Sequence, residues 1–260
     1  MKTLLRHVAL KLKSVLKNEL DIPVFHDDQH GTAIVVLAAL LNSLRLVDKQ
    51  KSSVRVVVCG AGSAGIAIAK LLLRDGFLNI VLVDKNGILN SIQPWMNWAQ
   101  KEIAETINPE RLSGNLAVAV AGSDIFIGVS GPNVLTEEMV ASMNYDAIVL
   151  AMANPDPEIL PHLAKRAGAR VVGTGRSDFP NQVNNVLAFP GIFKGVLQAR
   201  ASAITDEMKI AAAYAIAELV DAKELDANYI LPTALDRRVG PHVANAVIAV
   251  AADARSKLLR

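Results

Sequence analysis

The chain has 260 residues, of which 52% are hydrophobic and 20% are charged. This balance allows a sizeable buried core and excludes an intrinsically disordered chain. Because 27 basic side chains are matched by 25 acidic ones, the formal net charge is only +2, and we expect no nucleic-acid partner.

Two further features of the composition narrow the class of protein. Aromatic residues make up only 4%, and the abundant aliphatic residues favour buried parallel strands covered by helices. The single cysteine, Cys59, excludes an internal disulfide and fits a reducing compartment, so we expect a cytoplasmic protein. No apolar run approaches the roughly 20 residues that a membrane-spanning helix needs, and we expect no membrane association.

The first 20 residues are basic, with no acidic residue before Glu19. This pattern is compatible with an organelle transit peptide. Apolar residues recur at helical spacing, as at Leu5, Val8, Leu12 and Leu16, and they favour a surface helix instead. We therefore predict that residues 1–30 hold a lead-in helix followed by an acidic loop.

A repeating pattern of apolar runs and helical stretches follows. A short extended piece is expected at residues 22–25, and strands at residues 54–59, 79–84, 124–129, 147–152 and 169–173. Helices are expected at residues 32–46, 63–73, 96–107, 137–143 and 158–167, while residues 116–120 suit either a strand or a helix. Such alternation predicts βαβ units and a Rossmann-like, doubly wound parallel sheet with flanking helices over residues 31–200.

The end of the chain has a different pattern. Residues 206–220 and 241–256 are alanine-rich and helical in character, with Thr205 as an expected N-cap. We predict that residues 201–260 form a carboxyl-terminal helical segment that packs back on the core.

A glycine-rich segment carries the most specific signal for a ligand. Gly60-Ala61-Gly62-Ser63-Ala64-Gly65 follows a predicted strand and opens a predicted helix. The first glycine permits a tight turn, the second lets the backbone approach a pyrophosphate, and the third allows close packing of helix on strand. The helix N-terminus supplies N–H groups to the phosphates. These residues therefore predict a dinucleotide-binding turn.

An acidic residue completes this pattern. Asp84 ends the next predicted strand, 19 residues beyond Gly65, where a carboxylate accepts hydrogen bonds from the adenosine ribose. The same charge repels a 2′-phosphate, so NAD is favoured over NADP. The neighbouring Lys85 keeps NADP open, because a cation beside Asp84 tolerates a phosphate.

The segment His26-Asp27-Asp28-Gln29-His30-Gly31-Thr32 joins the extended piece to the first apolar helix. Its adjacent carboxylates, Asp27 and Asp28, suit a hard cation such as Mg²⁺ or Mn²⁺. The two histidines are a weaker signal for zinc, because no cysteine lies nearby. The alternative is a turn in which Asp28 or Thr32 caps a helix, and spacing alone leaves both interpretations open.

Asparagines follow the last two predicted strands. Asn154 ends one of them, and the amide-rich residues 173–185, which include Asn184 and Asn185, follow the other. Loops at the carboxyl ends of parallel strands hold the ligands of open sheets. Amides there suit a carboxylate or the nicotinamide carboxamide without adding charge, although Asn154-Pro155 is also a common turn initiator.

Together these segments resemble the successive signatures of bacterial-type malic enzymes. The resemblance covers about residues 20–240, in the family's order, and rests on residues 24–33, 60–65, 153–155 and 175–185. It implies the carboxyl-terminal, NAD-binding part of an enzyme that oxidatively decarboxylates malate to pyruvate and CO₂ with NAD(P) and Mg²⁺ or Mn²⁺. It also implies a homo-oligomer, a dimer or larger.

The resemblance assigns roles to individual residues. The family's metal-binding aspartate falls on Asp28, with Asp27 beside it. The asparagines that contact malate and the nicotinamide fall on Asn154 and Asn185, with Asn184 adjacent, and Thr32 joins the residues that bind the cofactor.

The family's general base, a lysine, its acid, a tyrosine, and a Glu-Asp metal-ligand pair have no counterpart that can be placed. Residues 1–20 contain no tyrosine, no aspartate and only one acid, Glu19. We therefore assign no catalytic residue and expect the reaction to need a complementing amino-terminal domain. The alternative is an NAD-binding module or regulatory subunit without catalysis. Another enzyme with the same cofactor domain, such as an amino-acid dehydrogenase, is disfavoured by the paired aspartates and asparagines.

Overall fold

The computed structural model describes residue 19 and residues 22–258, so nearly all of the expected lead-in helix, residues 1–20, lies outside the described residues. The strands are β1 (Arg55–Cys59), β2 (Asn79–Asp84), β3 (Gly87–Ile88), β4 (Ile125–Gly128), β5 (Ile148–Ala151) and β6 (Val171–Thr174). The helices before β6 are the π-helical turn η1 (Asp27–Gly31), α2 (Thr32–Val47), α3 (Ser63–Arg74), α4 (Trp98–Ala104), α5 (Leu116–Val120), α6 (Glu137–Ala141) and α7 (Pro161–Arg166). After β6 come the 3₁₀ turn η2 (Asn185–Leu187), α8 (Phe189–Gln198), α9 (Asp206–Glu218) and α10 (Val239–Leu258).

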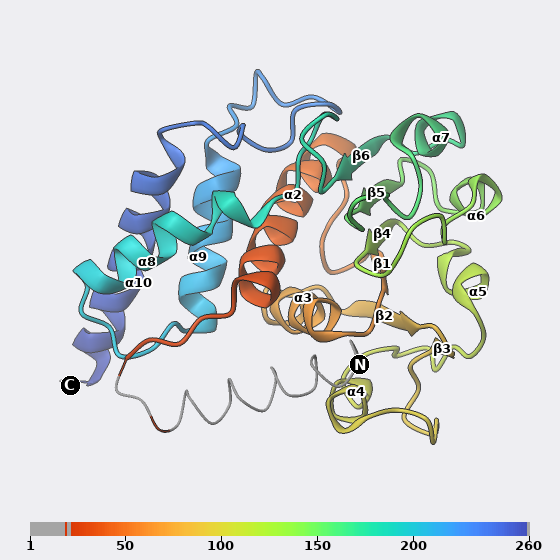
Figure 1. Ribbon diagram of the computed structural model, residues 1–260, viewed down its shortest axis with the longest axis horizontal. Helices are drawn as coiled ribbons and strands as arrows, with labels where there is room; N and C mark the ends of the chain where they lie inside the picture. Colours follow the sequence, from red (N-terminus) through yellow and green to blue (C-terminus); the bar gives the residue numbers. More distant parts are fainter. Residues whose placement is uncertain (1–18, 20–21, 259–260) are drawn as a thin grey trace.

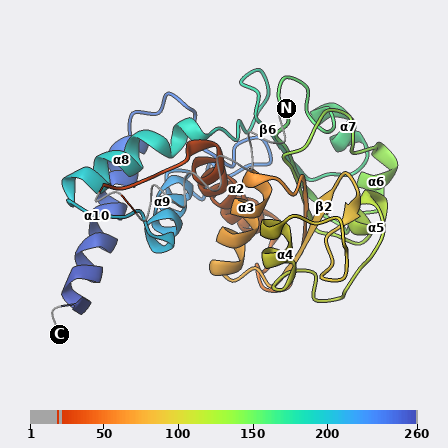
Figure 2. The ribbon, with the colours of Figure 1, turned by 60° about the horizontal axis from the view of Figure 1, so that its bottom comes forward.

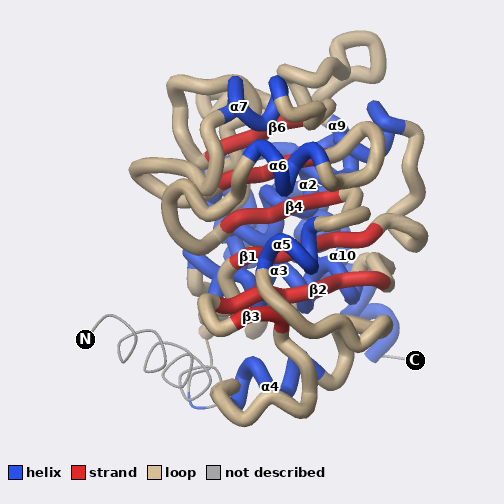
Figure 3. The backbone as a smooth tube through the Cα atoms, turned by 90° about the vertical axis from the view of Figure 1, so that its right-hand side faces the viewer, coloured by secondary structure: helices blue, strands red, loops and turns tan. Residues whose placement is uncertain are grey.

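The six strands form one sheet in the order β3-β2-β1-β4-β5-β6, and the tube drawing shows them stacked in this order (Figure 3). All neighbours are parallel except β3, which pairs antiparallel with the end of β2. Residues of β1 alternate between two cores, with Val56 and Val58 on one face and Val57 and Cys59 on the other. Continuous apolar runs form such strands because both faces are buried. The predicted Rossmann-like fold class is confirmed.

Helices cover both faces of the sheet. In Figure 3, α5, α6 and α7 lie in front of the strands, and α2 and α3 lie behind them. Helix α2 lies between the sheet and the group formed by α8, α9 and α10 (Figure 1). Its Asn42 side chain is fully buried and donates to the carbonyls of Ala217 and Ile230 at 3.0 and 2.9 Å. These bonds tie α9 and the segment around Ile230 to α2. The domain boundaries at residues 30 and 200 stay a prediction.

The stretch Asp27–Val47 corrects one expectation from the sequence. The turn η1 continues into α2 without a break, and the resulting 21 residues are long and apolar enough to cross a membrane. The sequence alone suggested no run of this length, because polar residues interrupt the apolar run soon after Leu41. In the fold, 78% of the apolar window is buried inside the protein, as in the core helix of a globular domain.

Other elements differ from expectation in ways that packing explains. Residues 116–120 form a helix, residues 22–25 do not join the sheet, and the two-residue strand β3 and helix α8 were not predicted. Helix α8 contains Gly191 and Gly195, and glycine disfavours a helix, so the sequence pattern did not predict one there. In the structure any side chain there would overlap Val243 or Val247 of α10, so the glycines allow the two helices to pack closely. Beyond this contact α10 projects away from the body of the molecule (Figure 2).

Candidate functional site

The segment between β1 and α3 forms the turn that its glycines predict. Gly60 has φ +112°, and its N–H donates to the carbonyl of Val83 at 2.8 Å. A side chain at Gly60 would overlap the carbonyl of Val129, and one at Gly65 would overlap the carbonyl of Gly60. A Cβ at Gly62, in contrast, would meet nothing within 4 Å. The N-terminus of α3 therefore stays accessible to an incoming phosphate.

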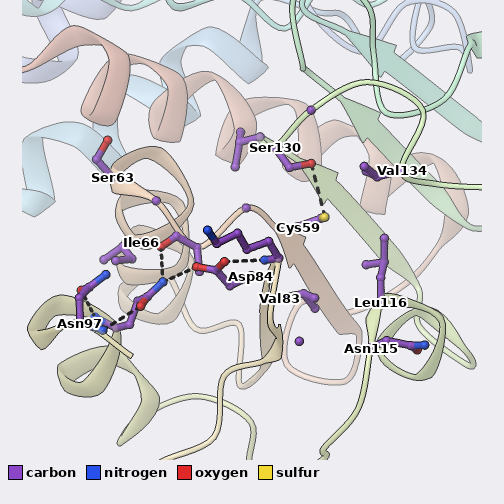
Figure 4. A pocket seen from close by; sticks show the side chains of 18 residues that line it. Cys59, Ser63, Ile66, Val83, Asp84, Asn97, Asn115, Leu116, Ser130 and Val134 are labelled. Carbon is purple, nitrogen blue, oxygen red and sulfur yellow. Dashed lines mark hydrogen bonds between the residues drawn. The ribbon is translucent and has the colours of Figure 1, made fainter. Parts of the chain in front are cut away.

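A cavity of about 740 Å³ opens beside this turn (Figure 4). Its volume lies within the range of cofactor sites. Five of the predicted cofactor residues line it, namely Gly60, Ala61, Gly62, Ser63 and Asp84. The others do not: Gly65 packs beneath the turn, Ala64 lies in the first turn of α3, Thr32 opens α2, and Asn154 follows β5.

Asp84 stands at the end of β2 and faces the cavity. One carboxylate oxygen accepts a hydrogen bond from the backbone N–H of Lys85 at 2.5 Å, and the other accepts one from the Gln100 amide at 2.6 Å. Each oxygen retains a second lone pair, because a carboxylate offers about four acceptor positions. The carboxylate is therefore oriented by the protein and keeps capacity for the hydroxyls of a ribose.

Gln100 is a residue that sequence reasoning missed. Its buried side chain donates from Nε2 to Asp84 and also to the carbonyl of Ala61, at 3.1 Å. Its Oε1 accepts from the N–H of Asn97, whose own side chain caps α4. The spacing of Asn97 and Gln100 is that of a capping box, and this signal was present in the sequence. The contacts of Gln100 with the glycine turn and with Asp84 were not.

The acidic segment folds as the turn η1 and directs one aspartate inward. Asp27 Oδ2 accepts a hydrogen bond from Asn185 Nδ2 at 2.5 Å, across 158 positions of sequence. Asp27 Oδ1 lies where a Cβ of residue 31 would be, so Gly31 is needed to make room for the carboxylate. Asp28 is exposed, and neither aspartate provides a side-chain cap for η1. The structure thus brings together Asp27 and Asn185 from the predicted set.

The electrostatics of Asp27 fit a cation ligand. Burial and the neighbouring charge of Asp28 raise the pKa of Asp27, while His26 acts in the opposite direction. Asp27 Oδ1 and His26 Nδ1 are buried and have no hydrogen-bond partner. A divalent cation would satisfy the orphaned oxygen and relieve the repulsion. Within the described residues, however, no group of three or more His, Cys, Asp or Glu side chains converges on a common point.

The asparagines after β6 have different roles. Asn181 is buried, with φ +57°, and its amide donates to the carbonyls of Val172 and Ala227, so it is structural. Asn184 caps η2 by accepting from the N–H of Val186 at 3.0 Å. Of the asparagines in this loop, Asn185 is the one that contacts another predicted site residue, Asp27.

The loops after β5 and β6 contact each other through Arg176. Its guanidinium makes two hydrogen bonds of 2.8 Å to Asp178 and donates to the carbonyl of Pro155 at 3.1 Å. The peptide bond between Asn154 and Pro155 is cis, and Asn154 itself is exposed. The structure therefore places Asn154 at the carboxyl edge of the sheet but does not bring its side chain to Asp27 or Asn185.

Comparison with known proteins agrees with this geometry. Residues 29–161 and 168–252 match the family model described as malic enzyme, NAD binding domain. The chain is 57% identical to the bifunctional malic/malolactic enzyme of Bacillus subtilis, covering 89% of this chain and 57% of that protein. It is 51% identical to the NAD-dependent malic enzyme of Geobacillus stearothermophilus, covering 94% of this chain and 51% of that protein.

Solved structures give the same result. The NAD-dependent malic enzyme of Thermotoga maritima shares 49% identity at a TM-score of 0.88, covering 92% of this chain and 63% of that one. The malic enzyme of Pyrococcus horikoshii shares 42% identity at a TM-score of 0.89, covering 95% and 59%. The chain thus spans about half the length of the curated relatives named here. It belongs to the malic enzyme family, through the family's NAD-binding domain.

Proposed function

We propose that this chain binds NAD at the Gly60–Gly65 turn and supplies the cofactor half of an enzyme that converts malate to pyruvate and CO₂. The observation that carries the proposal is the open N-terminus of α3 beside a 740 Å³ cavity with Asp84 on its wall. Relatives named as NAD-dependent and as NADP-dependent enzymes both match the chain. Asp84 supports NAD as the preferred cofactor.

The chemistry of the remaining residues agrees with this role. NAD bound at the glycine turn would supply the hydride acceptor, and a bound Mg²⁺ or Mn²⁺ would supply the positive charge that favours loss of CO₂. Asp27 and Asp28 would hold the cation, and Asn185 orients the Asp27 carboxylate by donating a hydrogen bond. Asn154 and Asn184 stay proposed contacts for substrate or nicotinamide.

Proton transfer needs a base within hydrogen-bond reach of the malate hydroxyl, and we assign none among the described residues. We therefore propose that a second polypeptide region completes the site, either an amino-terminal domain or another copy of the chain in a dimer. The second candidate function is an NAD-binding module without catalysis. It is favoured because the part of the chain that the structure describes holds no cluster of three or more metal-ligating side chains.

One experiment separates these functions. NADH formation from malate and Mn²⁺ is measured with the chain alone and with a separately supplied amino-terminal half of a close relative. Activity only on complementation supports the proposal, and NAD binding without activity in either case supports the module. Activity of the chain alone would show that a base lies within these 260 residues.

A further inference from the structure

Glu158 is a fully buried carboxylate that the functional assignment leaves unused. It lies in the loop after β5, four residues beyond Asn154. One oxygen, Oε1, accepts from the backbone N–H of Ser130 at 2.8 Å and from its hydroxyl at 3.1 Å. The other oxygen, Oε2, accepts from the backbone N–H of Ala153 at 3.0 Å. All three donors are neutral groups.

The two oxygens serve two different loops. Ser130 belongs to the loop after β4 and lines the nucleotide cavity with Val129 and Gly131. Ala153 immediately precedes Asn154, in the loop after β5. The backbone of the Glu158 segment adds to the connection, because its carbonyl accepts from the N–H of Leu135 at 3.0 Å. One side chain therefore holds together the carboxyl ends of neighbouring strands.

The surroundings of Glu158 are built around its carboxyl group. A side chain at Gly128, the last residue of β4, would overlap the Glu158 carboxyl carbon and both oxygens. The Ser130 hydroxyl also accepts from the thiol of Cys59, 3.5 Å away at the end of β1. A chain of contacts thus runs from β1 through Ser130 to Glu158 and on to Ala153. Networks of this kind rigidify a site when every member is satisfied.

We infer that Glu158 is a positioning residue. It fixes the position of Ser130, on the wall of the nucleotide cavity, relative to the loop that contains Ala153 and Asn154. The inference rests on the proposed binding of NAD. Glutamine at this position keeps the volume but offers a single acceptor oxygen, so its NH₂ group must face the N–H of either Ser130 or Ala153. One loop then loses its hydrogen bond, and a buried donor is left unpaired.

A control residue lies at the amino end of the same strand, β4. Asp124, next to the start of β4, is also a buried carboxylate and accepts from the N–H of Arg55 at 2.9 Å and from Asn144 at 3.1 Å. It also pairs with Lys49 at 2.8 Å. Asp124→Asn likewise replaces a buried carboxylate by an amide, at the end of β4 away from the nucleotide cavity, although it also removes the ion pair with Lys49.

The test measures the dissociation constant of NAD by calorimetry, together with the melting temperature of each variant. We expect Glu158→Gln to weaken NAD binding by about tenfold and Asp124→Asn to leave it within about twofold, although both lower the melting temperature. Equal NAD affinities of wild type and Glu158→Gln overturn the inference, as does an equal loss in Asp124→Asn. If the wild-type chain itself binds no NAD, it is the proposed function that fails.

A double-mutant cycle distinguishes positioning from general destabilisation. If Glu158 acts through Ser130, the effect of Ser130→Ala on NAD affinity should vanish in the Glu158→Gln background. Additive effects of the two substitutions on NAD affinity would contradict a shared route. Should Glu158→Gln fail to fold, Ser130→Ala and Ser130→Gly, which keep the backbone N–H, test the cavity side of the network. Unchanged NAD affinity in both would then overturn the inference.

Discussion

The glycine turn and the acidic turn η1 both contain residues with a predicted function, yet they differ in how completely the protein satisfies them. At the glycine turn, Asp84 accepts hydrogen bonds on both carboxylate oxygens, and Gln100 holds it to the turn. At η1, Asp27 is bonded on one oxygen while the other is buried without a partner.

This difference indicates what each region contributes. The nucleotide cavity is preformed by the described residues, so we expect it to bind NAD without help. The acidic turn carries an uncompensated carboxylate, which is costly in a folded protein unless a ligand pairs with it. We therefore expect that removing the Asp27 carboxylate stabilises the fold while it weakens cation binding, whereas a change at the glycine turn such as Gly65→Ala weakens both the fold and NAD binding.

The largest effect is expected at Gly65. A methyl group there overlaps the Gly60 carbonyl, so Gly65→Ala should lower the free energy of unfolding by about 3 kcal/mol and abolish NAD binding. Gly62→Ala is the control, because its methyl group meets no protein atom within 4 Å. It should keep the melting temperature while NAD affinity falls by about tenfold. Unchanged NAD affinity in Gly62→Ala would show that the pyrophosphate lies elsewhere.

Gly31 tests the acidic turn in the same way. Gly31→Ala places a methyl group on the Asp27 carboxylate, and we expect a loss of about 2 kcal/mol in the free energy of unfolding, measured in urea. Gly240→Ala in α10 has open space around it and should be neutral or slightly stabilising. Equal stability of Gly31→Ala and wild type would mean that Asp27 has another position.

Asp84 decides the preference between cofactors. Asp84→Ser removes the carboxylate that accepts from the ribose and repels a 2′-phosphate, so NAD affinity should fall by about tenfold and NADP affinity by less. Calorimetric titration of both nucleotides measures this difference. Equal losses for the two would remove the argument for NAD.

Gln100 should have a smaller effect on the same site. Gln100→Ala leaves Asp84 and the Ala61 carbonyl without their shared donor, and we expect NAD affinity to fall by about threefold to fivefold. The exposed neighbour Lys101 provides the control, since Lys101→Ala removes no contact with the glycine turn. If the two variants bind NAD equally well, orientation of Asp84 by Gln100 is unimportant.

The smallest effect is expected at Asp27 and has the opposite sign. Because burial and the charge of Asp28 raise its pKa, Asp27 favours folding below its unfolded pKa, and this contribution is lost as the pH rises through the folded value. Asp27→Asn should therefore raise the free energy of unfolding at pH 7 by less than about 1 kcal/mol and flatten its dependence on pH. Asp28→Asn removes the repulsion by Asp28 but leaves the burial of Asp27, so it should change both in the same direction and by less. A destabilised Asp27→Asn protein would contradict our account of this carboxylate.

Strands such as Asn79–Asp84 and the helix that begins at Ser63 were predicted within a few residues, because continuous apolar runs and glycine turns act over short range. Helix α8 was missed because its glycines, which favour loops, are explained only by their packing against α10.

The sequence by itself determined the Rossmann-like sheet, the glycine turn between β1 and α3 and the acidic residue at the end of β2, since periodicity and local hydrogen bonding set all three. Tertiary structure alone decided which side chains meet. Asp27 and Asn185 are 158 positions apart, and Glu158 contacts Ser130 across 28. Such pairs depend on how elements pack, and no local pattern encodes the distance between two loops that different strands bring to one edge of a sheet.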